Sequence, residues 1–110
     1  MDVLLVCQAG MSTTIMCKKI QEAAAKINDH INIVAAGLES IPKSAENKDI
    51  VLLAPQVKYA AQNIRKEVDP AIPIMIISPE DYGLMKGDAV YKKMKKVLES
   101  KAGEKGQTQK

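Results

Sequence analysis

The sequence predicts an α/β fold built on a single open parallel sheet of four strands. Four short apolar segments alternate with stretches whose apolar residues recur at helical spacing. That alternation is typical of parallel strands joined by right-handed helical crossovers. The first and third apolar segments, 3–6 and 50–53, contain no polar residues, so we expect them at the buried centre of the sheet. The strand order is then 2-1-3-4, with helices on both faces.

The expected strands are residues 3–6, 31–36, 50–53 and 74–77. The second is more polar than the first and third, which favours a place at the sheet edge. The fourth follows Pro73, whose missing N–H is tolerated where a strand begins. The residues from 78 to 85 are expected to form a loop.

Three helices are expected, at about residues 13–28, 55–68 and 87–100. Pro55 fits the first turn of the second helix, where a missing N–H is harmless. Each helix carries an apolar stripe at helical spacing. The stripes consist of Met16, Ile20, Ala23 and Ile27 in the first helix, Val57, Ala60, Ala61 and Ile64 in the second, and Val90, Met94, Val97 and Leu98 in the third.

The composition indicates one domain with an aliphatic core. The chain has 110 residues, enough for a single core. Only 3% of them are aromatic, with no Trp and no Phe. Residues 1–100 are expected to form the domain. Residues 101–110 are polar and contain glycine, which predicts a disordered tail.

Charge and cysteine spacing exclude several function classes. Lysines in residues 92–101 supply much of the net charge of +3. They indicate a solvated helix face, and no aromatic residues suited to base stacking accompany them, so no nucleic-acid partner is expected. Cys7 and Cys17 lack zinc spacing, and we expect no metal and no cofactor. With no signal peptide and no apolar stretch of about 20 residues, the chain is expected to be a cytoplasmic monomer with reduced thiols.

One octet, residues 7–14, brings a strand end, a tight loop and a helix N-terminus together at the thiol of Cys7. The loop's N–H groups and the helix dipole favour an anion. They would also stabilise the thiolate, which is the nucleophilic form. Our hypothesis is that Cys7 carries a phosphoryl group whose oxygens the loop holds. The expected phosphate loop comprises Gln8, Ala9, Gly10, Met11, Ser12, Thr13 and Thr14.

The alternative for Cys7 is a small apolar side chain in the core, as cysteines in buried strands usually are. The residues that follow count against it. Gly10 permits a tight backbone turn, and the nearby hydroxyl groups can cap a helix or bind phosphate oxygens. Cys17 lies beside the apolar stripe of the first helix and is expected to serve packing, while His30 is expected to be a surface turn residue.

The expected topology points to the same place. A strand order of 2-1-3-4 puts a switch point between the first and third strands, and ligands of such sheets bind there, beyond the carboxyl ends of the strands. Cys7 ends the first strand, and Pro55 and Gln56 follow the third. Topology and local chemistry therefore indicate one site by independent arguments.

Three sequence motifs lie in order along the chain. Residues 7–14 read CQAGMSTT, similar to a CxxGMSTS loop, residues 52–59 read LLAPQVKY, similar to LLGPQVRY, and residues 82–87 read YGLMKG, similar to YGxM(D/N)G. Together they resemble the sugar-specific enzyme IIB component of the bacterial phosphotransferase system, in its lactose/cellobiose/chitobiose family. The resemblance covers residues 1 to about 100. The departures are mild: Thr14, Ala54, Lys58 and Lys86 replace Ser, Gly, Arg and an acidic residue.

The resemblance implies a phosphotransferase with a fold similar to that of low-molecular-weight tyrosine phosphatase. Members take a phosphoryl group from a histidine of enzyme IIA onto the loop cysteine, here Cys7, and pass it to a sugar bound by the membrane component, enzyme IIC. The sugar would be a β-glucoside-type disaccharide, namely cellobiose, chitobiose or lactose. Docking at the membrane component would be transient, and a partner-facing rim would include Pro55, Gln56, Tyr59 and Tyr82.

The strongest alternative is a low-molecular-weight tyrosine phosphatase or an arsenate reductase, which also places a cysteine loop, CxxxxxR(S/T), after its first strand. Thr13 holds the position of that arginine, so the bidentate phosphate clamp is missing. Asp81 could imitate the phosphatase general acid, but Tyr82 follows it where that family has Pro. A non-catalytic binding module is the third alternative, and it has no use for a nucleophile at an anion site.

Overall fold

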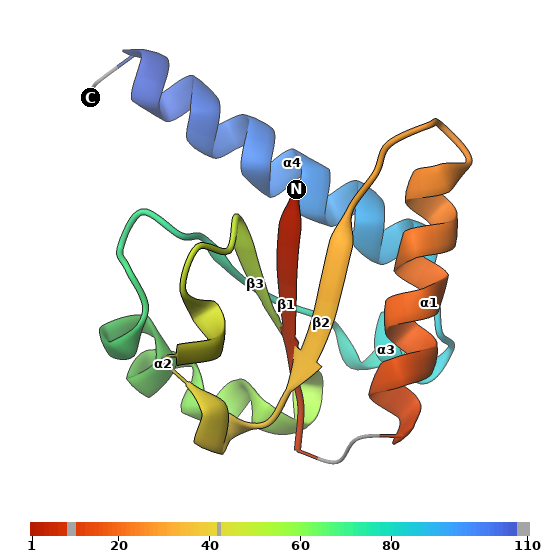
Figure 1. Cartoon of the computed structure of the whole chain (residues 1–110), viewed down its shortest axis with the longest axis horizontal. Helices are drawn as coiled ribbons and strands as arrows, with labels where there is room; N and C mark the ends of the chain where they lie inside the picture. The colour runs from red at the N-terminus through yellow and green to blue at the C-terminus, as the bar shows by residue number, and fades with distance from the viewer. Residues whose placement is uncertain (9–10, 42, 108–110) are drawn as a thin grey trace.

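The sheet has the topology that the sequence predicts. The computed structural model describes residues 1–8, 11–41 and 43–107. All three strand pairs are parallel, and the order is β2-β1-β3-β4 (Figure 1). The predicted fold class and strand order are therefore confirmed. The strands are β1 (Asp2–Val6), β2 (Asn32–Ala36), β3 (Ile50–Leu53) and β4 (Ile74–Ile76).

The two central strands form the core of the sheet. In β1 the four residues after Asp2 are buried, and so are all four residues of β3. An uninterrupted apolar strand requires cover on both faces, which only a central position supplies. β2 is half exposed, with Val34 at 51%, as expected for an edge strand.

Helices cover both faces of the sheet. α1 and α4 pack against each other on one face, and the 3₁₀ helices and α2 lie on the other (Figure 1). The α1–α4 crossing is close at Gly87, where an added Cβ would lie 2.5 Å from the carbonyl carbon of Lys19. The long helices are α1 (Met11–Ala25) and α4 (Gly87–Gln107), and the opposite face carries three 3₁₀ helices, η1 (Leu38–Ser40), η2 (Lys43–Ala45) and η3 (Pro55–Ala60), followed by α2 (Ala61–Glu67).

α1 begins and ends earlier than the pattern of apolar residues predicts. Its end is set by Asn28, which adopts the left-handed conformation at φ 59°, while the N–H of Asp29 donates to the carbonyl oxygen of Ala24 at 2.9 Å. Such a left-handed residue is a common C-terminal stop. Ile27, expected on the apolar stripe, therefore lies beyond the helix and is 66% exposed. That assignment was wrong.

The helix expected over residues 55–68 is interrupted. Pro55 begins a helix, as predicted, but the helix is of the 3₁₀ type, and Val57 leaves helical geometry at φ −114° and ψ 15°. The α-helix proper, α2, starts only at Ala61. Val57 and Ile64 nevertheless both lie in the core, as the apolar stripe predicts, and are 0% and 2% exposed. The interruption therefore changes the type of helix but not which face is buried.

Two further boundaries differ from the prediction. The expected loop after β4 contains a short helix, α3 (Pro79–Gly83), whose N-cap is Ser78. α4 continues to Gln107, so the backbone of residues 101–107 is helical where disorder was expected. Lys, Ala, Glu and Gln favour helices, and extending an existing helix needs no new nucleus. That residues 101–110 are dispensable stays a prediction, and residues 108–110 lie outside the described part of the chain.

Over the residues that the structure describes, no helix is both long enough and apolar enough to cross a bilayer.

Candidate functional site

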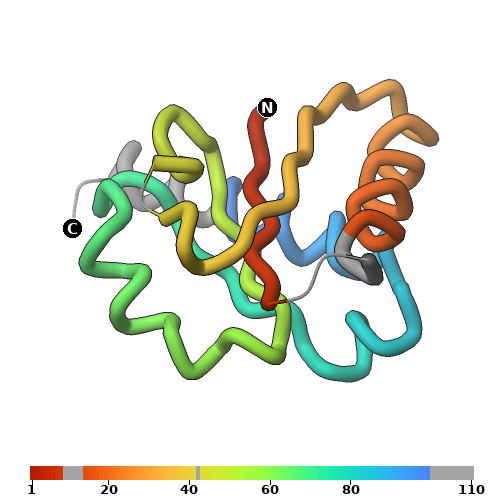
Figure 2. The backbone as a smooth tube through the Cα atoms, turned by 60° about the horizontal axis from the view of Figure 1, so that its bottom comes forward, coloured from red at the N-terminus to blue at the C-terminus, as the bar shows by residue number. Residues whose placement is uncertain are grey.

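The candidate residues gather at the carboxyl edge of the sheet. Cys7 follows β1, Pro55 opens η3 directly after β3, and α3 follows β4. β1 and β3 are neighbours, with Val6 paired to Leu53, so the segments that leave them start side by side. Figure 2 turns this edge toward the viewer. The switch point expected from the topology is therefore the place where Cys7 lies.

Cys7 is held from two sides by the sheet. Its N–H donates to the carbonyl oxygen of Ala36 at 3.0 Å, and the carbonyl oxygen of Val6 accepts from the N–H of Ala54 at 2.9 Å. The Cys7 side chain is 5% exposed and belongs to the core cluster. It forms no disulfide with Cys17. The backbone thus fixes this thiol at the boundary between the core and the carboxyl edge.

The expected phosphate loop is described only in part. Gln8 is exposed, and Ala9 and Gly10 lie outside the described residues. α1 begins at Met11, so Met11, Ser12, Thr13 and Thr14 form its first turn instead of a loop. A helix N-terminus therefore starts four residues after Cys7. That residues 8–14 hold phosphate oxygens stays a prediction.

The four residues of the expected rim differ in exposure. Tyr59 is 70% exposed, Gln56 is exposed and Pro55 is half buried, so these three offer surface at the carboxyl edge. Tyr82 is 5% exposed and belongs to the same core cluster as Cys7. A side chain buried to this extent offers a partner almost no surface, so Tyr82 is not among the exposed rim residues. The YGLMKG motif alone gave no sign of that burial.

Two exposed apolar residues at the same edge were missed. Ile15 lies near the start of α1 and is 51% exposed, and Leu84 follows α3 and is 64% exposed. Large apolar side chains in solvent are informative where several gather beside a candidate site. The position of Ile15 outside the predicted apolar stripe of α1 could have indicated that its side chain is exposed. No feature of the sequence indicated that Leu84 is exposed, because residues 78–85 were expected to be an irregular loop.

Cys17 has the surroundings of a packing residue, as expected. It is 9% exposed on the side of α1 that faces the core. Burial, and to a smaller extent the charge of a nearby Cys7 thiolate, raise the pKa of Cys17 to about 11. Near neutral pH it is therefore a protonated thiol, which is a poor nucleophile.

Asp81 forms a close ion pair with α4. The Nζ of Lys93 lies 2.6 Å from the Asp81 carboxylate, and the Asp81 N–H donates to the Oγ of Ser78 at 3.1 Å. The hydrogen bond from Lys93 holds the pKa of Asp81 below its ordinary value, despite the opposing effect of burial. An ionised carboxylate that is engaged in this way has no proton to donate near neutral pH.

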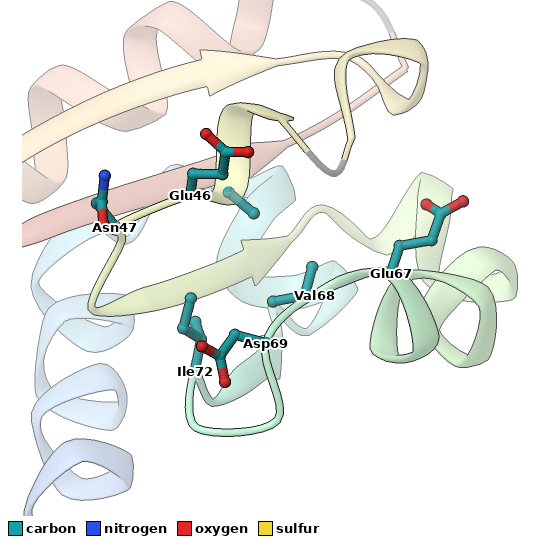
Figure 3. Close-up of a pocket in the computed structure, with 7 residues that line it drawn as sticks. Glu46, Asn47, Glu67, Val68, Asp69 and Ile72 are labelled. Carbon is teal, nitrogen blue, oxygen red and sulfur yellow. The ribbon is translucent and has the colours of Figure 1, made fainter.

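Within the described residues, 1–8, 11–41 and 43–107, no group of three or more His, Cys, Asp or Glu side chains could hold a metal ion. His30 is an exposed turn residue. A hollow of about 390 Å³ opens at the amino edge of β3 and β4, away from Cys7. The carboxylates of Glu46, Glu67 and Asp69 stand apart from one another around it (Figure 3).

Comparison with curated proteins finds sugar-specific components of one transport system. The chain is 34% identical over 94 residues to the galactose-specific EIIB component of the phosphotransferase system of Lactococcus lactis subsp. cremoris, covering 80% of this chain and 87% of the relative. It is also 34% identical to the cellobiose-specific EIIB component of Lactococcus lactis subsp. lactis, with the same coverage. The oligo-β-mannoside-specific EIIB component of Bacillus subtilis is 31% identical and is covered to 87%.

Solved structures agree with this assignment. The solution structure of the cellobiose-specific IIB component from Borrelia burgdorferi superposes with a TM-score of 0.75 at 34% identity, covering 92% of this chain and 94% of the other. The lactose-specific IIB domain from Streptococcus pneumoniae shares the fold, with a TM-score of 0.74 at 17% identity. Residues 2–93 match the family model described as PTS system, Lactose/Cellobiose specific IIB subunit. The chain therefore belongs to the lactose/cellobiose-specific IIB family of the phosphotransferase system.

Proposed function

We propose that Cys7 is the phosphoryl carrier of a sugar phosphotransferase system. It would receive the group from a phosphohistidine of enzyme IIA and deliver it to a sugar held by the membrane component, enzyme IIC. The observation that carries the proposal is the position of Cys7, which directly follows the central strand β1 at the switch point of a IIB-family fold. A helix N-terminus begins four residues later, which supplies positive potential for a phosphate.

The chemistry consists of two in-line phosphoryl transfers. In the first, the Cys7 thiolate attacks the phosphorus, the S–P bond forms and the P–N bond breaks, and the histidine nitrogen keeps the bonding electrons. In the second, a sugar hydroxyl oxygen attacks the same phosphorus, the S–P bond breaks and the thiolate is regenerated. The hydroxyl proton leaves to a base or to solvent. Splitting the reaction into two steps is the general use of a covalent intermediate.

The proposal favours a carrier over a phosphatase for two reasons. Thr13 stands where phosphatases of this fold have the loop arginine, so the clamp that stabilises the hydrolytic transition state is absent. Asp81, the candidate general acid, is ionised and paired with Lys93. A phosphocysteine without these two groups should persist until its acceptor docks.

Docking would use the exposed side chains at the carboxyl edge. Gln56 and Tyr59, with Ile15 and Leu84, offer polar and apolar surface around the segment that leaves β1. Interfaces for successive transient partners are expected to be modest in area. We propose that the chain acts as a monomer in the cytoplasm and meets the membrane only through enzyme IIC. The sugar we propose is a β-linked disaccharide, because relatives are named for cellobiose and oligo-β-mannosides.

Intact-mass analysis tests the proposal. The protein would be incubated with phosphoenolpyruvate, the general phosphotransferase proteins and candidate enzymes IIA. We expect a gain of one phosphoryl group, carried on the peptide that contains Cys7. Membranes bearing enzyme IIC and the correct disaccharide should then remove it. No gain with any enzyme IIA, or a phosphate on another residue, would refute the carrier assignment. Rapid Cys7-dependent hydrolysis of an aryl phosphate would support the phosphatase alternative instead.

A further inference from the structure

Asp81 stands apart from the other charged residues of the protein. Among the residues whose burial is described, it is the one charged side chain in the buried class, with 7% exposed. Its partner Lys93 is 57% exposed at the side chain and reaches in from α4. Asp81 belongs to α3 and Lys93 to α4, so the ion pair adds a side-chain contact between the two helices beyond the short hydrogen-bonded link of residues 84–86.

α3 needs such an anchor. It has only five residues, and helices of this length are not stable by themselves. The N-cap bond to Ser78 and the bond from the Lys86 N–H to the carbonyl oxygen of Asp81, at 2.9 Å, are local. The charge-assisted bond from Lys93 and the burial of Tyr82 are two contacts that tie α3 to the rest of the fold. Charge-assisted bonds are roughly twice as strong as neutral ones.

The location of α3 gives this anchor a functional meaning. α3 follows β4 at the carboxyl edge and packs against α4. Its Tyr82 is buried in the core. Directly after α3, Leu84 is 64% exposed, and Met85 adopts a left-handed conformation at φ 53°. The position of α3 therefore determines where the exposed side chain of Leu84 would contact a docking partner.

We propose that Asp81 is a positioning residue for phosphoryl transfer, which acts through Lys93 to hold α3 and Leu84 in the orientation that a docking partner recognises. The inference rests on the proposed function, because it assigns Leu84 to the surface that enzyme IIA contacts. Asp81 itself touches neither the phosphoryl group nor the partner.

Asp81 is buried and Lys93 is more than half exposed, so removing one member of the ion pair should have a different effect from removing the other. Lys93→Met leaves the buried carboxylate of Asp81 without its cation, which is the costly way to break an ion pair. The carboxylate would gain water only if α3 moved outward. Asp81→Asn removes the charge instead and leaves Lys93 in solvent, where it is already more than half exposed. The double variant should therefore resemble Asp81→Asn more than Lys93→Met.

Steady-state transfer from phosphorylated enzyme IIA tests this order of effects. Lys93→Met should raise the KM for enzyme IIA roughly tenfold and leave kcat within about twofold, because docking is impaired but the Cys7 chemistry is not. Asp81→Asn and the double variant should raise KM by less. Lys92→Met is the matched control, since Lys92 is an exposed neighbour in α4 that forms no salt bridge with any residue the structure describes, and it should leave KM unchanged.

A second measurement does not depend on the function. Amide hydrogen exchange in the peptide that covers residues 79–85 should be faster in Lys93→Met than in Lys92→Met. Equal exchange, or a fall in kcat with KM unchanged, would overturn the positioning role. If the unmodified protein accepted no phosphate at all, the proposed function would fail, whereas the exchange result would still decide whether Asp81 anchors α3.

Discussion

Cys7 and Cys17 are both buried thiols, yet the backbone around them differs in kind. Cys7 ends a strand, and the chain after it leaves the sheet before α1 begins. Cys17 lies within α1 and is surrounded by core side chains. Their exposed fractions, 5% and 9%, are nearly the same. Burial by itself therefore does not separate a candidate nucleophile from a packing residue.

We propose that the backbone N–H groups available to each thiol make the difference. Inside a helix each N–H is committed to the carbonyl oxygen four residues earlier, so a mid-helix thiol finds no spare donor to stabilise its negative charge. The first turn of a helix leaves its N–H groups without intrahelical partners. A thiol at a strand end that precedes such a turn is in a position to use them. Four predictions test this contrast, in order of decreasing effect.

Serine substitution separates the two thiols most sharply. Cys7→Ser should reduce phosphoryl uptake from enzyme IIA by at least about a thousandfold, because a serine hydroxyl stays protonated near neutral pH. Cys17→Ser should retain uptake within about twofold, since this side chain takes no part in transfer. Intact-mass analysis and circular dichroism would check phosphate content and fold. Phosphate on the Cys7→Ser protein, or loss of uptake in a folded Cys17→Ser protein, would contradict the assignment of Cys7 as the carrier and Cys17 as a packing residue.

The pH dependence of alkylation should distinguish the same two residues in the unmodified protein. With a pKa of about 11, Cys17 is only about 0.1% thiolate at pH 8. Its reaction with iodoacetamide should therefore speed up about tenfold per pH unit and level off only above about pH 11. Cys7 should react first, and inorganic phosphate should slow it without affecting Cys17. Equal rates at pH 8, or no protection by phosphate, would count against an anion site at residues 8–14.

The close α1–α4 crossing offers a way to disturb Cys17 alone. In Gly87→Ala the new Cβ would lie 2.5 Å from backbone and side-chain carbon atoms of Lys19, so α1 and α4 must separate. Overpacking of this kind costs about 1–3 kcal/mol. We expect that loss of unfolding free energy in urea, with faster alkylation of Cys17 but not of Cys7.

Gly83→Ala is the matched control for this experiment. A Cβ at Gly83 would have no neighbour within 4 Å, so stability should change by less than about 0.5 kcal/mol. Destabilisation by Gly83→Ala to the same extent as by Gly87→Ala would show that the close crossing is not the cause.

Deletion of residues 101–110 should have the smallest effect. α4 extends to Gln107, but among residues 87–99, whose burial is described, the buried ones are Gly87, Val90, Tyr91 and Met94, all within the first eight residues of the helix. We expect the melting temperature, phosphoryl uptake and the alkylation of both cysteines to stay within error. A substantial fall in melting temperature would place the last turns of α4 inside the cooperative domain.

The parts of the fold that could be predicted rest on local pattern. The apolar runs at 3–6 and 50–53 required central strands, and the alternation with helices required a parallel sheet. Cys7 could be placed at the switch point for the same reason. The kink at Val57 and the exposure of Ile27 were not predictable in this way. Each depends on where the core surface ends, and helical periodicity carries no information about that.

The features of the candidate site also fall into those that follow from local sequence and those that depend on tertiary packing. The sequence by itself determined the type of site: a thiol at the end of a buried strand, a glycine and hydroxyl residues after it, and no arginine at position 13. Only the tertiary structure decided that Tyr82 faces inward, that Ile15 and Leu84 face solvent, and that Asp81 pairs with Lys93. The physical reason is that local pattern sets backbone conformation. Which side chains meet across helices depends on how α1, α3 and α4 pack on the sheet, and residues distant in sequence settle that packing together.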